Sequence, residues 1–133
     1  MKTILVVDDE LFARRIISYK LKSHGYTVLT ADCAETALQL VQSQALDLVL
    51  TDLQMPGMSG IELAEVLMRD SRQADVPVLL ITAREFEVDR NRCRQTNIKE
   101  VIAKPFSMTS IIKRVSALIG PGELVAAAAS LDD

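Results

Sequence analysis

Short apolar runs alternate along the chain with longer segments in which apolar residues recur every three or four positions. The runs are rich in β-branched residues, so they predict five strands, at residues 4–7, 26–30, 48–51, 78–82 and 101–103. In the first, third and fourth runs the apolar residues do not alternate with polar ones, which is typical of strands covered on both faces. A sheet buried between two layers is therefore expected.

The segments between the runs have helical spacing. The first is expected to face the core with Ala13, Ile16, Ile17 and Leu21. The second carries the stripe Ala34, Ala37, Leu38 and Val41, and Asp32 with Glu35 predicts a start like a capping box. Each of these stripes is one side of an amphipathic helix, and that side should pack against the sheet.

Two further helices have clear boundary signals. Ser59 and Glu62 are placed to cap a helix that runs to Met68. The last helix is closed by Gly120 and Pro121, and its stripe consists of Ile111, Ile112, Val115, Leu118 and Ile119.

The segment 85–97 has a weaker helical pattern, because its only large apolar residues are Phe86, Val88 and Cys93. Three arginines lie in this segment and a fourth directly precedes it: Arg90, Arg92, Arg94 and Arg84. We predict a solvated helix here. A second hypothesis makes these arginines a docking surface for an acidic partner.

Strand and helix alternate five times, which predicts an α/β fold with a parallel sheet, right-handed crossovers and helices on both faces. The chain has 133 residues, of which 49% are apolar and 25% charged, as expected for one compact soluble domain with a core of its own. Residues 121–133 are expected to be a C-terminal tail: a native end, a truncated linker or a short helical extension.

Charge and cysteine content narrow the class of protein. The net charge of −3 disfavours direct binding of nucleic acid. Cys33 and Cys93 have neither the spacing of a zinc site nor that of a disulfide framework, which is consistent with a reducing cytoplasm. The apolar run at the N-terminus is too short for a signal peptide, and no stretch has the length of a membrane span.

Polar residues end the predicted strands, where an open parallel sheet binds its ligands. Asp8 and Asp9 end the first, Asp52 the third, Thr82 the fourth and Lys104 the fifth. Three carboxylates packed together repel unless a cation lies among them, and oxygen ligands without histidine or cysteine select a hard ion such as Mg²⁺. The sequence therefore predicts a magnesium site.

The same residues suit phosphoryl chemistry. A divalent ion and Lys104 can neutralise the oxygens of a phosphoryl group from two sides, and Thr82 offers a hydroxyl donor. Asp52 would then be the nucleophile, because a carboxylate that attacks phosphorus forms an acyl phosphate. A shift of the Thr82 hydroxyl toward the new group would change the neighbouring surface.

Four stretches, each at the end of a predicted strand, resemble one family. They are Ile-Leu-Val-Val-Asp-Asp-Glu at 4–10, Asp-Leu-Gln-Met-Pro-Gly-Met-Ser-Gly at 52–60, Thr-Ala at 82–83 and Lys-Pro-Phe at 104–106. Together they resemble the receiver domain of two-component response regulators, single-domain chemotaxis regulators included, with residues 1–120 as the domain. The resemblance implies a flavodoxin-like, doubly wound five-stranded parallel sheet in the order 2-1-3-4-5 with five helices.

The resemblance also implies roles for residues. Asp52 would accept a phosphoryl group from the phosphohistidine of a histidine kinase or phosphotransfer protein. Asp9, Asp52 and the backbone carbonyl of Gln54 would coordinate Mg²⁺, and Asp8 would act through a bound water. Thr82 would be the switch hydroxyl, and Lys104 would pair with the phosphoryl group and precede a cis proline. The protein would then be a cytoplasmic phosphoprotein that assists its own phosphorylation and dephosphorylation, not an enzyme.

Some positions depart from the family pattern. Val101 stands where many receivers have an aromatic residue that rotates on activation, and 95–98 replaces a small-residue turn. Gln54 and Arg84 occupy variable positions at which side chains in the family modulate phosphoryl lifetime. His24 is expected to be a solvated residue at a helix end, not a phosphoacceptor.

Three functions remain open from the sequence. The first is a phosphorylatable switch that passes its signal to another protein or to an output domain. The second is a module on the same fold that binds partners without phosphorylation, which Val101 favours. The third is a small phosphohydrolase, against which Gln54 counts, because an acid/base carboxylate would be needed at that position.

Overall fold

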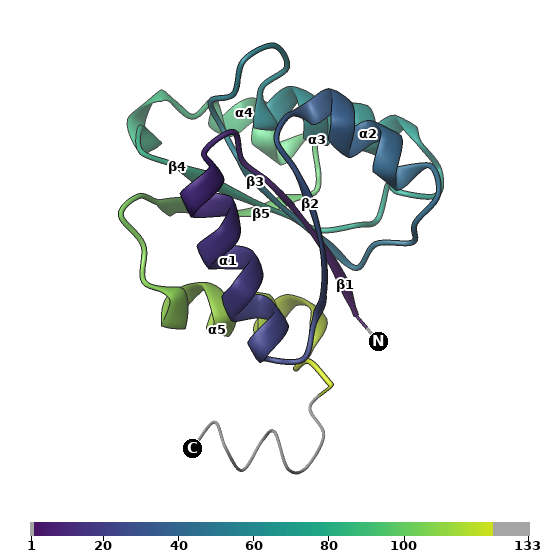
Figure 1. The fold of residues 1–133 in the computed structure, drawn as a ribbon. Coiled ribbons are helices and arrows are strands. Elements are labelled where there is room, and N and C mark those ends of the chain that lie inside the picture. Colours follow the sequence, from purple (N-terminus) through teal and green to yellow (C-terminus); the bar gives the residue numbers. More distant parts are fainter. Residues whose placement is uncertain (1, 124–133) are drawn as a thin grey trace.

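The computed structural model describes residues 2–123, which form one parallel sheet with helices on both faces (Figure 1). The strands are β1 (Thr3–Val7), β2 (Thr27–Ala31), β3 (Leu48–Asp52), β4 (Val78–Thr82) and β5 (Ile98–Ala103). The helices are α1 (Leu11–Ser23), α2 (Ala34–Val41), α3 (Gly60–Arg69), α4 (Arg90–Arg94) and α5 (Met108–Ile119), with a 3₁₀ turn, η1, at Glu85–Glu87. The strand order β2-β1-β3-β4-β5 confirms the expected flavodoxin-like fold.

Alternate residues of each central strand point to opposite layers. From β1, Ile4 and Val6 pack in one core cluster with Ile17 of α1 and Ile111 of α5. Leu5 and Val7 belong to a second cluster, which α2 and α3 complete. All residues of β3 and β4 are buried, which confirms that these apolar runs are covered on both faces. Full burial of one such side chain stabilises the fold by about 1.5–3 kcal/mol.

Side-chain caps begin α3, α4 and α5 but not α1 or α2. Ser59 accepts the N–H of Glu62, and the Glu62 side chain accepts the N–H of Ser59, so the predicted capping box at α3 is confirmed. The capping box expected at α2 is wrong: the N-cap is Cys33, whose side chain makes no capping hydrogen bond. The chain is extended at Cys33, so Ala34 begins the helix one residue later than a cap at Asp32 would require.

The prediction for α1 is partly wrong. Ile17 and Leu21 are fully buried, but Ile16 is 54% exposed and Ser18 is buried in its place. Successive residues lie 100° apart on a helix, so one helix cannot turn both Ile16 and Leu21 fully to the sheet. Phe12 and Tyr19, at 77% and 74%, extend the exposed apolar side chains along α1.

The segment 85–97 is not the single helix expected from its pattern. It forms η1 and then α4, which has only five residues and is capped by the Asp89 carboxylate through the N–H groups of Asn91 and Arg92. Val88 and Cys93 are buried, while Phe86 is 86% exposed. β5 begins at Ile98, three residues earlier than predicted, because Ile98 and Glu100 pair with Val78 and Leu79 of β4, across a register shift.

The end of α5 lies beside the turn between α1 and β2. Gly120 closes the helix with a φ of 87°, and its carbonyl accepts the Tyr26 hydroxyl at 2.8 Å. Glu123 donates its N–H to the carbonyl of Gly25 at 3.1 Å. Of the tail expected at 121–133, residues 124–133 lie outside the described part of the chain. Within residues 2–123, no helix has both the length and the apolarity to cross a membrane.

Candidate functional site: an acidic cluster with a buried lysine

Three aspartates meet at the carboxyl edge of the sheet. Asp8 and Asp9 follow β1, and Asp52 is the last residue of the adjacent β3. Because parallel neighbouring strands end at one edge, their terminal side chains come together. Each aspartate offers a carboxylate oxygen, and these atoms all lie within 4.8 Å of one another. Asp8 and Asp52 are 2% and 7% exposed, whereas Asp9 faces solvent.

Lys104 places an ammonium group between the two buried carboxylates. Its Nζ lies 3.4 Å from Oδ2 of Asp8 and 3.5 Å from Oδ2 of Asp52. The residue directly follows β5, and the peptide bond to Pro105 is cis, as the resemblance implies. Its backbone N–H donates to the carbonyl of Thr82, so the chain after β5 is joined to the end of β4.

Burial and charge shift the pKa values of this pair. Burial raises the pKa of Asp52, the nearby Lys104 opposes this rise, and the negative charge of Asp8 adds to it. For Lys104, burial lowers the pKa, but the carboxylates of Asp52 and Asp8 outweigh it and the net shift is upward. One ammonium among three carboxylates leaves a net negative charge, so the cluster can accept a further cation.

Thr82 is 1% exposed at the end of β4. Its Oγ1 accepts the backbone N–H of Arg84 at 2.9 Å, which holds the hydroxyl oxygen at the start of the following loop. Leu53, the residue after Asp52, donates its N–H to the carbonyl of Ile81, so the ends of β3 and β4 are joined. Asp8, Asp9, Asp52, Thr82 and Lys104 thus all lie at one edge, as the sequence predicted.

Gly60 lets helix α3 approach the end of β3 closely. A Cβ at this position would collide with the backbone oxygen of Asp52 and lie 2.8 Å from Leu80 Cδ1. The N–H of Gly60 donates to the carbonyl of Leu53 at 2.9 Å. The absence of a side chain at Gly60 therefore fixes where the backbone of Asp52 can lie.

Gln54 is exposed on the loop between β3 and α3. The metal-ligand role of its backbone carbonyl stays a prediction. Its side chain donates to the carboxylate of Glu87, a residue that sequence reasoning did not single out. Glu87 lies in a charge-rich segment without a hydrophobic pattern, so nothing in the sequence marks it. Its contact with Gln54 arises only when the two loops fold next to each other.

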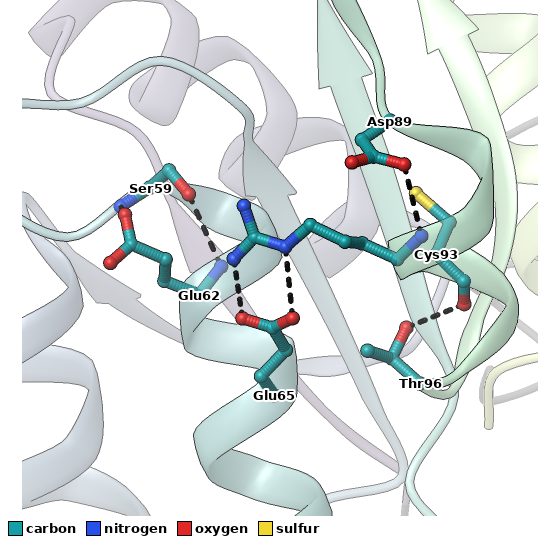
Figure 2. A network of polar contacts seen from close by, with 7 residues as sticks. Ser59, Glu62, Glu65, Asp89, Cys93 and Thr96 are labelled. Carbon is teal, nitrogen blue, oxygen red and sulfur yellow. Dashed lines mark hydrogen bonds and ion pairs between the residues drawn. The ribbon is translucent and has the colours of Figure 1, made fainter.

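The arginines of this region face acidic or polar partners in the same chain. Arg84 pairs with Glu87, and Arg90 with Glu85. Arg92 forms two hydrogen bonds to Glu65 of α3, at 3.0 and 2.5 Å, drawn in Figure 2 beside the Ser59–Glu62 capping box and the Asp89 cap. These contacts favour the solvated-face interpretation over docking of an acidic partner, because the arginine charges are already partly neutralised.

Val101 is half-buried in β5 and packs against a small cluster beneath α4. The cluster contains Leu53, Ile61, Leu80, Val88 and Cys93. A pocket of about 220 Å³ lies beside Val101 between α4 and β5. Val101 therefore places a small side chain next to this pocket, where the family resemblance implies an aromatic ring.

The chain matches the family model of the response regulator receiver domain over residues 4–116. It is 37% identical over 125 residues to the phosphate regulon transcriptional regulatory protein PhoB of Pseudomonas aeruginosa, a match covering 92% of this chain and 55% of PhoB. It is 33% identical to the alkaline phosphatase synthesis transcriptional regulatory protein PhoP of Bacillus subtilis, over 94% of this chain and 51% of PhoP.

The chain belongs to the response regulator receiver family. As a receiver domain it is a component of two-component signalling. It spans about half the length of the curated relatives that it matches.

Solved structures agree with this assignment. The receiver domain resembles the response regulator TrrA of Thermotoga maritima, solved in complex with Mg²⁺-BeF, with a TM-score of 0.79, 33% identity and coverage of 89% of this chain and 99% of TrrA. It also resembles the chemotaxis response regulator CheY4 of Vibrio cholerae, with a TM-score of 0.80, 26% identity and coverage of 89% and 98%.

Proposed function

We propose that this receiver domain is a phosphorylatable switch whose acceptor is Asp52. The observation that carries the proposal is the position of Lys104 Nζ, 3.4 Å from Asp8 and 3.5 Å from Asp52 in a largely buried acidic cluster. An ammonium held in this way can pair with a phosphoryl oxygen once Asp52 is modified. A surface salt bridge or a turn does not require three aspartates, so neither structural role accounts for the clustering of Asp8, Asp9 and Asp52 at the ends of two strands.

The cluster also fits a magnesium ion. All of its side-chain donors are carboxylate oxygens, which hard divalent ions prefer, and one oxygen from each aspartate lies within 4.8 Å of the others. Asp9, Asp52 and the backbone carbonyl of Gln54 would hold the ion directly, and Asp8 through a water. When bound, Mg²⁺ would neutralise negative charge on the phosphoryl oxygens.

The transfer would depend on bound Mg²⁺ and on the residues at this edge of the sheet. An oxygen of Asp52 bonds to the phosphorus of a donor phosphohistidine, while the bond from phosphorus to the imidazole nitrogen breaks and that nitrogen keeps the electron pair. Lys104 pairs with one phosphoryl oxygen. The Thr82 hydroxyl, whose oxygen accepts the Arg84 N–H, keeps its proton to donate to another phosphoryl oxygen.

The domain would return to its resting state by hydrolysis. A water oxygen bonds to phosphorus as the bond to the Asp52 oxygen breaks, the carboxylate leaves with the electron pair, and inorganic phosphate is released. The chain thus assists its own phosphorylation and dephosphorylation, and it is not an enzyme that turns over separate substrates.

The donor would be a histidine kinase or a phosphotransfer protein, and we place its docking on α1. This helix begins at Leu11, three residues after Asp8, so its first turn borders the acidic cluster. Its exposed apolar side chains are those of Leu11, Phe12, Ile16 and Tyr19. A partner that covers them would remove apolar surface from water and bring its phosphohistidine close to Asp52.

Phosphorylation would be read at the surface of α4 and β5, which follow Thr82 and precede Lys104. The signal would pass to another protein or to an output domain. We propose residues 1–120 as the receiver and residues 121–133 as a tail or linker. Direct binding of nucleic acid by this chain is not part of the proposal, because its net charge is −3.

Val101 favours a second candidate, a module that binds partners without phosphorylation. Val101 lies beside the 220 Å³ pocket. In the family pattern an aromatic ring at this position couples Thr82 to the surface, and Val101 has no such ring. The two candidates differ in one property, whether partner binding changes when Asp52 is modified.

Intact mass after incubation with Mg²⁺ and acetyl phosphate tests the proposal. We expect one phosphoryl adduct on the native chain and none on Asp52→Asn. Asp47→Asn is the matched control, because Asp47 precedes the other end of the same strand. It should gain the adduct like the native chain. An unmodified native chain, or an equal adduct on Asp52→Asn, contradicts the proposal, and sustained turnover of added phosphoesters would support a hydrolase instead.

A further inference from the structure

Glu87 joins two loops that border the acidic cluster. Its Oε2 accepts the side-chain amide of Gln54 at 2.9 Å, and its Oε1 accepts Arg84 NH1 at 3.1 Å. Gln54 lies two residues after Asp52, on the loop from β3, and Arg84 lies two residues after Thr82, on the loop from β4. One carboxylate thus holds the polar ends of both side chains.

A phosphoryl group on Asp52 would compete with Glu87 for the guanidinium of Arg84. Its pair with Glu87 is exposed, at 58% and 39% of the two side chains, and exposed ion pairs are weak. A phosphoryl group carries about −1.5 to −2 charges, against one on Glu87. The backbone N–H of Arg84 donates to the Thr82 hydroxyl oxygen at 2.9 Å, so this residue lies at the border of the site.

We propose that Glu87 is a positioning residue that shortens the lifetime of the phosphoryl group by holding Arg84 and Gln54 away from it. This inference rests on the proposed phosphorylation of Asp52. With Glu87 in place, its carboxylate competes for the guanidinium, so Arg84 spends less time on the phosphoryl oxygens and water keeps access to phosphorus. Without that charge, Arg84 pairs with the phosphoryl oxygens and covers them, so hydrolysis slows.

Glu85 provides a matched control. It lies two residues before Glu87 in the same 3₁₀ turn, it is exposed, and its carboxylate pairs with Arg90 of α4 instead of with the loops at the site. Glu87→Gln and Glu85→Gln each remove one negative charge from the turn and keep the shape of the side chain. Any effect of the net charge of the turn is therefore common to both variants.

The first measurement is the half-life of the phosphoryl adduct. Each protein is loaded with acetyl phosphate and Mg²⁺, freed of donor, and followed by intact mass. We expect Glu87→Gln to lengthen the half-life at least about threefold, Glu85→Gln to leave it as in the native chain, and Arg84→Ala to abolish the lengthening in the double variant. A half-life that is unchanged or shortened in Glu87→Gln, or a lengthening that survives Arg84→Ala, overturns the inference.

The second measurement needs neither metal nor phosphoryl group. In NMR spectra of the unmodified protein, the Gln54 side-chain amide should shift and exchange faster with water in Glu87→Gln, and keep its native signal in Glu85→Gln. An unchanged Gln54 amide in Glu87→Gln overturns the inference. Failure of the native chain to accept a phosphoryl group overturns the proposed function and this inference together, whereas equal half-lives overturn the inference alone.

Discussion

The ammonium of Lys104 lies 3.5 Å from the carboxylate of Asp52, and their side chains are only 19% and 9% exposed. The two residues come from strands that are not neighbours, because β4 lies between β3 and β5. Their contact therefore depends on the whole carboxyl edge of the sheet being assembled. It also partly neutralises the negative charge of the acidic cluster, on which the stability of Asp52→Asn and the binding of Mg²⁺ depend.

In magnesium-free buffer, Asp52→Asn should stabilise the fold, and more so as the pH rises. Burial raises the pKa of Asp52, so the folded chain binds this proton more tightly than the unfolded chain. That contribution to stability is fully present below the ordinary carboxyl pKa of about 3.9 and is lost as the pH rises through the raised value. Asn carries no such proton, so the gain in stability of the variant over the native chain should grow as the pH rises through the raised pKa of Asp52 and be largest near neutral pH.

Urea denaturation of both proteins between about pH 3.5 and 8, with chelator present, measures the difference. Asp75→Asn, a change at an exposed aspartate between α3 and β4, is the control and should follow the native chain. A constant difference between Asp52→Asn and the native protein across this range would contradict the sign of the shift.

Magnesium should stabilise the native chain through the acidic cluster. An ion that binds only the folded state adds about 2.7 kcal/mol at 100 times its Kd, which raises Tm by several degrees. Asp9→Asn removes one carboxylate of the cluster and should lose most of this rise. The control Asp47→Asn should keep the full rise in Tm. Thermal melts with and without Mg²⁺ measure this rise for each protein. A rise in Asp9→Asn equal to that of the native chain would show that the ion binds elsewhere.

Gly60→Ala should destabilise the protein, although alanine has a higher helix propensity than glycine. The added Cβ would meet the backbone oxygen of Asp52 and the side chain of Leu80, so either strand or helix must shift. We expect a loss of about 1–3 kcal/mol in urea denaturation, with slower phosphorylation of Asp52. Native stability in this variant would show that α3 can move away from β3 without cost.

Ile16 and Ile17 are adjacent in sequence but should respond differently to alanine. Ile17 is fully buried, so Ile17→Ala should cost about 2–5 kcal/mol. Ile16 is 54% exposed, so Ile16→Ala should change stability by less than about 0.5 kcal/mol. If α1 docks the phosphodonor, Ile16→Ala should still weaken transfer from it while leaving phosphorylation by acetyl phosphate unchanged. Equal transfer would remove α1 from the docking surface.

The sheet and the acidic cluster were predictable from the sequence for a physical reason. Central parallel strands are buried on both faces, so β3 and β4 read as unbroken apolar runs, and the residues that end them must share one edge. The strand order, the cis bond before Pro105 and the metal-ligand role of the Gln54 carbonyl came from the family resemblance. The roles of Asp52, Thr82 and Lys104 also followed from the chemistry of the residues that end the strands.

Other features depend on contacts that local pattern does not encode. Ile16 is adjacent to Ile17 in sequence, and the direction in which α1 turns toward the sheet buries Ile17 and Leu21 while leaving Ile16 54% exposed. The short α4 is held by the Asp89 cap and by Arg92, which reaches Glu65 on another helix (Figure 2). The Glu87 bridge likewise joins residues 33 positions apart on two loops.

The contact between Glu123 and Gly25 determines where the described chain leaves the domain. Gly25 precedes β2, so this exit lies at the amino edge of the sheet, whereas Asp52 closes β3 at the carboxyl edge. A five-residue strand, about 17 Å of backbone, separates the two edges. A label or a second protein fused directly after Glu123 would therefore start at the opposite edge of the sheet from the phosphodonor. Such a fusion leaves the mouth of the acidic cluster open, and any attached module must sense phosphorylation through the sheet and helices or by folding back around them.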